Sequence, residues 1–248
     1  MWLPVGTDTD PATLTGLLTA STQAGEQAYL VPDGGADAGP AAQDVALTAL
    51  RSVAEELGTA ALGRVRHRLV VTHPVTAEDR AFLAAAGVSA TVVPDADGVL
   101  HAPVASLLAD AVTVCLGAGP AGDPWAAVRS ALSHPDPDER ISARSAFAAA
   151  TRTPLRALPD APAARLSVAP RLSVSAPAVF GVWDADAVAV QSPDGRVAAW
   201  STDTRAGTPL LPALDAETAL PRWRATWVDG RIAAEDVARD AHDAATPA

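Results

Sequence analysis

The sequence contains no lysine, so arginine supplies every positively charged side chain. A single cysteine, Cys115, cannot form a disulfide within the chain. No apolar run approaches the roughly 20 residues that cross a bilayer, because Gly, Pro or charged residues break the longest candidates. No N-terminal stretch combines a basic start, an apolar centre and a small-residue cleavage site. These absences predict a cytoplasmic protein that does not span membranes, and the missing lysines are typical of a GC-rich genome.

The remaining composition is that of an acidic globular protein. Of 248 residues, 49% are hydrophobic and 19% are charged, and alanine supplies much of the apolar count. This length can bury one sizeable core, or a medium core with a small satellite. The net charge of -11 argues against nucleic acid and membrane surfaces as partners, because both attract clustered positive charge. Small molecules and other proteins remain as partner classes.

Residues 1–152 alternate between helical and strand patterns. Asp10, Thr76, Asp123 and Ser142 each stand before an apolar stripe at helical spacing, where an N-cap is expected. Short apolar runs between these stripes predict strands at 27–31, 68–71, 89–93 and 112–116. Such strands, joined by helices, are typical of a parallel sheet covered on both faces. The pattern predicts about four β/α units.

The pattern changes after residue 152. Residues 153–177 are rich in Pro and Ala, lack a helical period, and predict a linker or an irregular wrap. Residues 178–234 carry strand patterns separated by turn signals, which predict a small antiparallel module. The segment 235–248 forms a polar, alanine-rich tail, which predicts either a frayed helix or disorder.

Four segments stand out by their order and spacing: Arg66–Leu69 before Thr76–Asp79, Asp123–Val128, Ile141–Phe147 and Val197–Pro209. Together they resemble the amidohydrolase superfamily and its YtcJ-like branch, and the last segment is typical of actinobacterial members. The resemblance implies an α/β fold: a partial (β/α) TIM-type barrel followed by a small antiparallel β-sandwich module. It also implies that the chain begins around the fifth barrel strand, with metal ligands expected at the carboxyl ends of the strands.

The positions that match the family's metal ligands hold other residues. No His-x-His pair occurs, and without lysine the carboxylated lysine of two-metal members cannot form. Pro32 follows the strand where a histidine is expected, Val71 replaces the next ligand histidine, and Gly117–Pro120 replaces the Gly-Ser-Asp-x-Pro run. Catalytic zinc needs about three protein ligands, so the resemblance implies that no metal is bound. Asp33 and His73 remain as weak catalytic candidates.

Other polar groups have simpler structural explanations. Asp33 with Asp37, or Asp95 with Asp97, could be paired carboxylates, yet Asp beside Gly and Pro commonly forms turns. The histidines lack metal-binding spacing, so each is expected at the surface or in a loop. Burial in an apolar strand should raise the pKa of Cys115 and leave the thiol inert.

A glycine-rich segment and a group of tryptophans also have ordinary structural explanations. The segment 117–122 lacks the third glycine of a dinucleotide fingerprint, which makes a nucleotide site improbable. The tryptophans at 183, 200, 223 and 227 could form a carbohydrate or peptide surface, but packing within a small module is the commoner role of such rings.

These observations predict a divergent amidohydrolase-like protein, a pseudoenzyme without cofactor that acts by binding or assembly. The alternative is a hydrolase acting on an amide or other non-peptide C–N bond, with a site completed by another chain. A third interpretation is a decayed remnant without a selected role. Because a half barrel exposes two sheet edges, we expect a homo-oligomer or a barrel-completing protein partner, with a small molecule as a further ligand class.

Overall fold

The computed structural model describes residues 1–35, 39–159, 174, 176–191, 200–201 and 210–236. It divides into two compact units, Met1–Ser167 and Val168–Ala248, which are described separately. Within the described residues, no helix combines the length and apolar character needed to cross a bilayer.

The first unit is built around a parallel sheet in the order β1-β2-β3-β4-β5. Its strands are β1 (Trp2–Val5), β2 (Tyr29–Pro32), β3 (Arg68–Val71), β4 (Ser89–Val92) and β5 (Val114–Leu116). The expected α/β class and parallel sheet are therefore present, but with one strand more than the expected four units. β1 escaped prediction because it is short and contains Pro4, and proline within a run argues against a strand.

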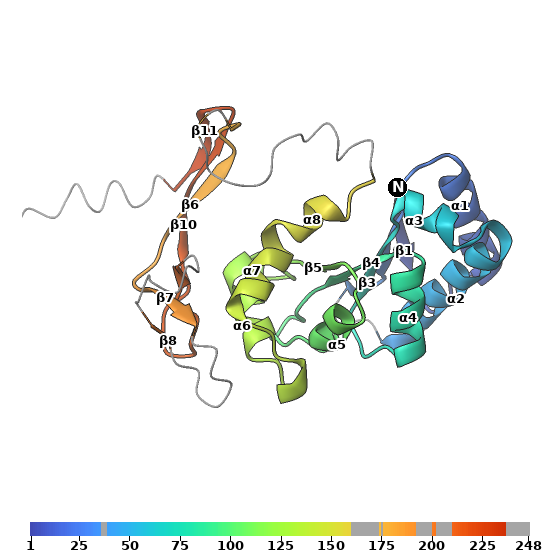
Figure 1. Cartoon of the computed structure of the whole chain (residues 1–248), viewed down its shortest axis with the longest axis horizontal. Helices are drawn as coiled ribbons and strands as arrows, with labels where there is room; N and C mark the ends of the chain where they lie inside the picture. Colours follow the sequence, from blue (N-terminus) through green and yellow to red (C-terminus); the bar gives the residue numbers. More distant parts are fainter. Residues whose placement is uncertain (36–38, 160–173, 175, 192–199, 202–209, 237–248) are drawn as a thin grey trace, which may run out of the picture. The chain divides into compact units, whose positions relative to one another are not determined.

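Helices connect these strands and continue after β5 (Figure 1). They are α1 (Pro11–Gln23), α2 (Pro40–Leu57), α3 (Thr59–Val65), α4 (Ala77–Ala85), α5 (Val104–Ala109), α6 (Pro124–Leu132), a 3₁₀ turn η2 (Pro137–Glu139), α7 (Ala143–Thr151) and α8 (Thr153–Arg156). The side chains of Asp10, Thr76, Asp123 and Ser142 accept backbone hydrogen bonds at their helix starts, as predicted. Sequence patterns missed α3, and α8 lies within the segment expected to lack helical structure.

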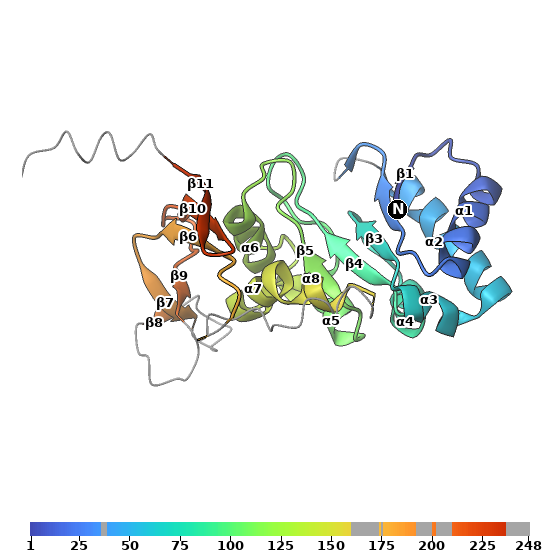
Figure 2. The same cartoon turned by 90° about the horizontal axis from the view of Figure 1, so that it is seen from above.

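The winding of the sheet places its helices on one face. Each crossover leads to the adjacent strand in the same direction, and right-handed crossovers of that kind put the connecting helices on the same side. Figure 2 shows the strands in succession from β1 to β5. The connecting helices therefore lie on one face, while the other face is covered in part: Thr91 and Cys115 are buried there, and the Pro154 carbonyl of α8 accepts a hydrogen bond from Nη2 of Arg68.

The two faces differ in composition. One cross-sheet row, which defines the outer face, is entirely apolar and buried: Leu3, Leu30, Leu69, Ala90 and Val114. The opposite row, on the inner face, runs Trp2, Tyr29, Arg68 and Ser89. Burial on this face falls toward β1: Thr91 and Cys115 are buried, Tyr29 is half-buried, and Trp2 is 62% exposed. The core of the unit therefore lies between the outer face and its helices.

A buried histidine links α1 to the outer face. His67 lies in the short loop before β3, as one of the two predicted alternatives, but it is completely buried, so the surface alternative was wrong for this residue. Its Nδ1 accepts a hydrogen bond from the Ala28 amide at 2.9 Å, and its Nε2 lies 2.8 Å from Oγ1 of Thr22. His134 is also buried. Both histidines lie in loops, as predicted, but no sequence signal indicated their burial.

The second unit contains two three-stranded antiparallel sheets, ordered β11-β10-β6 and β8-β7-β9. Their strands are β6 (Phe180–Asp184), β7 (Val188–Gln191), β8 (Trp200–Ser201), β9 (Leu211–Pro212), β10 (Arg222–Val228) and β11 (Arg231–Glu235). The small antiparallel module is thus present. The predicted turn at 192–195, most of the Val197–Pro209 segment and the tail at 237–248 lie outside the described residues.

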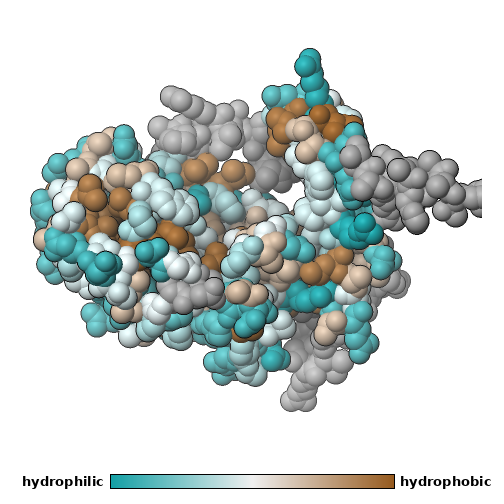
Figure 3. Space-filling model, turned by 180° about the vertical axis from the view of Figure 1, so that it is seen from behind, coloured by the Kyte–Doolittle hydropathy of each residue, from teal (hydrophilic) through white to brown (hydrophobic). Residues whose placement is uncertain are grey.

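Three tryptophans of this unit occupy positions between core and surface. Trp183, Trp223 and Trp227 are half-buried, and Trp227 stacks on Phe180 with ring centroids 5.8 Å apart. Nε1 of Trp223 donates to Oγ1 of Thr226 at 3.1 Å. Figure 3 shows hydrophobic side chains gathered in patches among hydrophilic ones on the face it views. Packing between neighbouring strands accounts for the Trp227 and Phe180 rings.

Candidate functional site

The carboxyl edge of the parallel sheet is the place where a β/α fold gathers functional side chains. After β1, Thr9 Oγ1 accepts a hydrogen bond from the Gly6 amide at 2.7 Å and closes a tight turn. After β2, the Asp33 amide donates to the Val5 carbonyl at 2.7 Å, so the ladder continues one residue past the strand. Asp33 therefore follows Val31 onto the inner face by alternation.

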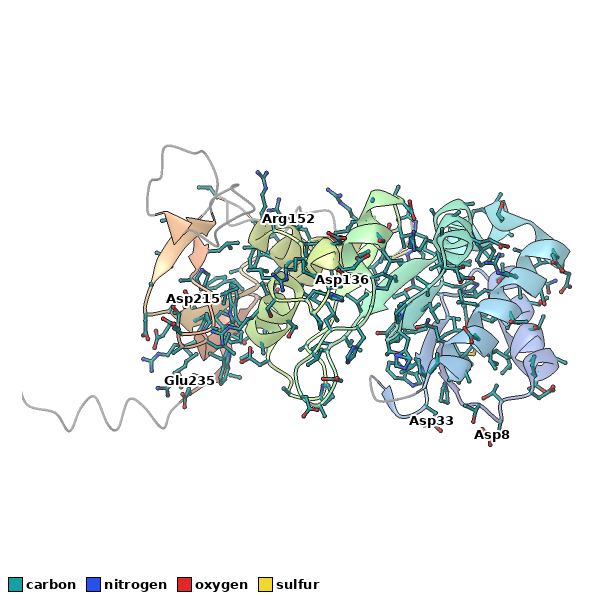
Figure 4. All side chains as sticks on the ribbon, turned by 90° about the horizontal axis from the view of Figure 1, so that it is seen from below. Asp8, Asp33, Asp136, Arg152, Asp215 and Glu235 are labelled. Carbon is teal, nitrogen blue, oxygen red and sulfur yellow. The ribbon has the colours of Figure 1, made fainter. Side chains whose placement is uncertain are left out.

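Asp33 and Asp8 lie close together at this edge (Figure 4). A Cβ placed on Gly6 would meet the Asp8 carboxylate at 2.6 Å and Cβ of Asp33 at 3.9 Å. Both carboxylates are exposed to solvent. Asp37, the partner weighed from the sequence, lies outside the described residues, whereas sequence reasoning did not pair Asp33 with Asp8 because β1 was not recognised.

Gln43 of α2 fixes the loop after β3. Its Oε1 accepts hydrogen bonds from the amides of Thr72 at 3.0 Å and His73 at 3.2 Å. Gln43 is almost completely buried, so its amide replaces the sheet ladder where β3 ends. Polar residues are seldom buried without such partners, yet a lone Gln on a helix pattern gives no signal of this role.

His73 lies in the loop after β3, as Pro74 indicated. Burial lowers the pKa of His73, the charge of His101 lowers it further, and Asp44 raises it. His101 in turn places Nε2 2.8 Å from Oδ2 of Asp95. The other oxygen of Asp95 accepts the amides of Asp97 and Val99, which is the hydrogen-bonding pattern of a turn-forming aspartate.

The glycine-rich loop after β5 packs closely on the loop after β4. Gly119 has φ +66°, and a Cβ there would lie 2.8 Å from Cγ and 2.9 Å from the carbonyl oxygen of Pro94. Gly122 also has a positive φ, of +67°, but faces open space. The close approach at Gly119 explains the residue type without a nucleotide.

The structure changes the interpretation of the ligand positions. By alternation, Pro32 and Val71 share the outer face with Leu30 and Leu69, and both are buried. The inward positions one residue past the strands are, by the same alternation, Gly6, Asp33, Thr72, Val93 and Gly117. The inward groups at the strand ends thus include one carboxylate and no imidazole.

Two inner-face hydroxyls are buried near this edge. Oγ1 of Thr72 and Oγ1 of Thr91 have no hydrogen-bond partner among the described residues. Cys115 lies beside Thr91 in register, and burial raises the pKa of its thiol while Arg68 lowers it, as the apolar strand predicted. Across the part of the chain that the structure describes, no three His, Cys, Asp or Glu side chains are grouped closely enough to hold a metal ion.

Comparison with known proteins identifies the fold. No family model and no curated protein matches the sequence. Among solved structures, atrazine chlorohydrolase TrzN from Arthrobacter aurescens TC1 complexed with zinc is 18% identical with a TM-score of 0.55, over 94% of this chain and 51% of that chain. A mutant of that enzyme with zinc and atraton is 18% identical with a TM-score of 0.51, over 98% and 53%.

A triazine hydrolase variant is also 18% identical, with a TM-score of 0.53, over 97% of this chain and 53% of that chain. The chain therefore spans about half the length of the structures that it matches. At this identity the likeness establishes the fold, while activity depends on the site itself. The chain shares its fold with these triazine hydrolases over about half of their length: a parallel five-stranded α/β sheet followed by small antiparallel sheets.

Proposed function

We propose that this chain is a divergent amidohydrolase-like protein that acts by binding or assembly, without metal-dependent hydrolysis by its own residues. The fold supports the first part of this proposal. The second part depends on the strand ends. Fold alone would favour a hydrolase, so the support for this proposal comes from the side chains at the carboxyl edge.

The single observation that carries the proposal is the set of inward strand-end residues. Gly6, Val93 and Gly117 offer no side-chain donor atom, Thr72 offers one hydroxyl, and Asp33 offers one carboxylate. His73 is in a loop whose backbone is fixed by Gln43, and the sequence has no lysine to carboxylate. Zinc that activates water needs about three protein ligands and an open position. The described edge supplies too few groups for that arrangement.

The test is metal analysis of the full chain, produced with added zinc and dialysed against metal-free buffer. We expect far less than one zinc per chain, and an unchanged value in Asp33→Asn and His73→Asn. Stoichiometric zinc that is lost in either variant would overturn the proposal, because those residues would then be ligands. Cooperative thermal unfolding of all three proteins serves as the folding control and argues against a decayed remnant.

A second candidate is a hydrolase acting on an amide or other non-peptide C–N bond, with a site completed by another chain. The observation that favours it is the contact of 2.8 Å between His101 Nε2 and Asp95 Oδ2, since a carboxylate can orient an imidazole as a general base. A chromogenic anilide would be assayed with the chain alone and with any chain that co-purifies with it from the native cells.

Activity that requires both chains and falls about a hundredfold in His101→Asn would support this candidate. Asp95→Asn should give a similar loss. Equal activity in the wild type and both variants, or no activity with either preparation, would count against it.

A further inference from the structure

The inner face of the first unit is incompletely covered beside β1. Trp2 is exposed and Tyr29 is half-buried, and their rings meet edge to face with centroids 4.9 Å apart. Pro4 is exposed and Val31 is half-buried on the same face. We name Trp2, Pro4, Tyr29 and Val31 the β1–β2 patch. Parallel sheets almost always have both faces covered, so this patch is an unusual surface for a β/α unit.

Strand addition at the β1 edge is impeded. The carbonyls of Met1 and Val5 accept hydrogen bonds from β2, so these residues and Leu3 direct their backbone groups inward. Trp2 and Pro4 therefore direct theirs toward the open edge. Pro4 has no N–H to donate there, and proline is a common device that blocks strand pairing at an edge.

At the other end of the sheet, α7 and α8 both pack against β5. The proline at the β1 edge argues against a partner that continues the sheet there. A partner would instead contact the inner face through side chains.

The dimensions of the patch fit one helix. Its two strands lie about 4.8 Å apart, and four residues at about 3.3 Å each extend about 13 Å. An α-helix is about 10 Å wide, and two turns rise about 11 Å. A rigid aromatic pair that offers apolar area with little loss of side-chain entropy is typical of interface anchors.

The amino end of the inner face adds positive charge beside the patch. Arg68 is the register neighbour of Tyr29, and Ser89 is the next residue in the same row. Ser89 also lines a pocket of about 300 Å³ with Arg66 and Arg156. Nη2 of Arg68 donates to the Pro154 carbonyl at 2.8 Å, and Nη1 of Arg66 donates to the carbonyls of Arg156 and Leu158. Both guanidinium groups keep their positive charge, and arginine recognises carboxylates with directed hydrogen bonds from its other N–H groups. In a chain of net charge -11, this end of the face favours an acidic group.

We infer that the β1–β2 patch docks an amphipathic helix of another protein, with an apolar stripe over Trp2 and Tyr29 and an acidic residue toward Arg68. This inference rests on the proposed role in binding or assembly and names the partner's chemistry. An apolar stripe at positions i, i+3, i+4 and i+7 would cover the aromatic pair. The docked helix would cover the part of the inner face that stays exposed because the connecting helices lie on the outer face.

The probe is a displayed library of helical peptides with randomised surface positions, selected for binding to the full chain. Enriched peptides should share an apolar stripe and acidic residues, and their affinity should fall about tenfold or more for Trp2→Ala. Leu17→Ala on α1, where the side chain is 43% exposed, is the matched control and should leave affinity unchanged. Arg68→Gln should lower the affinity of peptides that carry Glu more than the affinity of the same peptides with Gln in place of Glu.

The other outcomes overturn the inference. They are binders that ignore Trp2, no binders, or photocrosslinks from position 2 that reach only residues 168–248 of the same chain. A dimer in sedimentation that Trp2→Ala dissociates would assign the patch to a second copy. Unchanged thermal unfolding of Trp2→Ala excludes a folding defect. Zinc content is independent of these results, so stoichiometric zinc would refute the proposed function, whereas Trp2-independent binding would refute only the docked helix.

Discussion

Acidification should destabilise the first unit through His67, because this residue is buried in its neutral form. Burial lowers the pKa of His67 from 6.5 to about 4, and the positive charge of the N-terminus adds to the effect. The hydrogen bonds of His67 also favour its neutral form. The Ala28 amide donates to Nδ1, so that atom must be unprotonated, and Nε2–H can then donate to Thr22 Oγ1, which donates to the Leu18 carbonyl.

The sign and magnitude follow from proton linkage. The unfolded chain binds a proton at His67 near pH 6.5, while the folded chain binds it only near pH 4. The stabilisation from neutral His67 is therefore complete above pH 6.5 and is lost as pH falls from there to about 4. At about 1.4 kcal/mol for each tenfold change in proton affinity, the loss across this window is about 3 kcal/mol.

Urea unfolding between pH 7 and pH 4 measures this effect. Wild type should lose about 3 kcal/mol more of its free energy of unfolding across the window than His67→Gln, whose amide can accept from Ala28 and donate to Thr22 without titrating. His101→Gln, which replaces a partly exposed ring, is the control. Its free energy of unfolding should fall with pH as steeply as that of wild type. The reasoning is refuted if the free energy of unfolding of His67→Gln falls with pH as steeply as that of wild type. It is also refuted if the His67 ring of the folded chain has a pKa near 6.5.

Three substitutions test how the carboxyl edge is built. Gln43→Met should lower the free energy of unfolding by about 3 kcal/mol in urea denaturation, because two buried amides lose their acceptor; a loss below about 1 kcal/mol would contradict the role of Gln43. Gly119→Ala should cost about 1–3 kcal/mol more than Gly122→Ala, since both require a left-handed residue but only the first meets Pro94; equal losses would remove the packing argument. Thr76→Ala should cost about 1 kcal/mol by removing the α4 cap, and an unchanged melting temperature would refute this.

Local patterns determined most elements of the first unit. Asp10, Thr76 and Asp123 cap their helices because short polar side chains satisfy the free amides of a first turn, and this chemistry is written within a few residues. Buried strands such as β3 are continuous apolar runs for the same local reason. The resemblance to amidohydrolases agrees with the structural neighbours at the level of the fold, while membership of the YtcJ-like branch stays a prediction.

The tertiary structure decided which face each residue occupies. The sequence presented Pro32 and Val71 as vacant ligand positions, yet strand direction and register turn both toward the outer face, and Asp33 faces inward beside Gly6. β1 could not be predicted, because its stability comes from pairing with β2 rather than from its own four residues. Burial of His67 and the uncovered β1–β2 patch likewise depend on how distant segments meet, which no local pattern encodes.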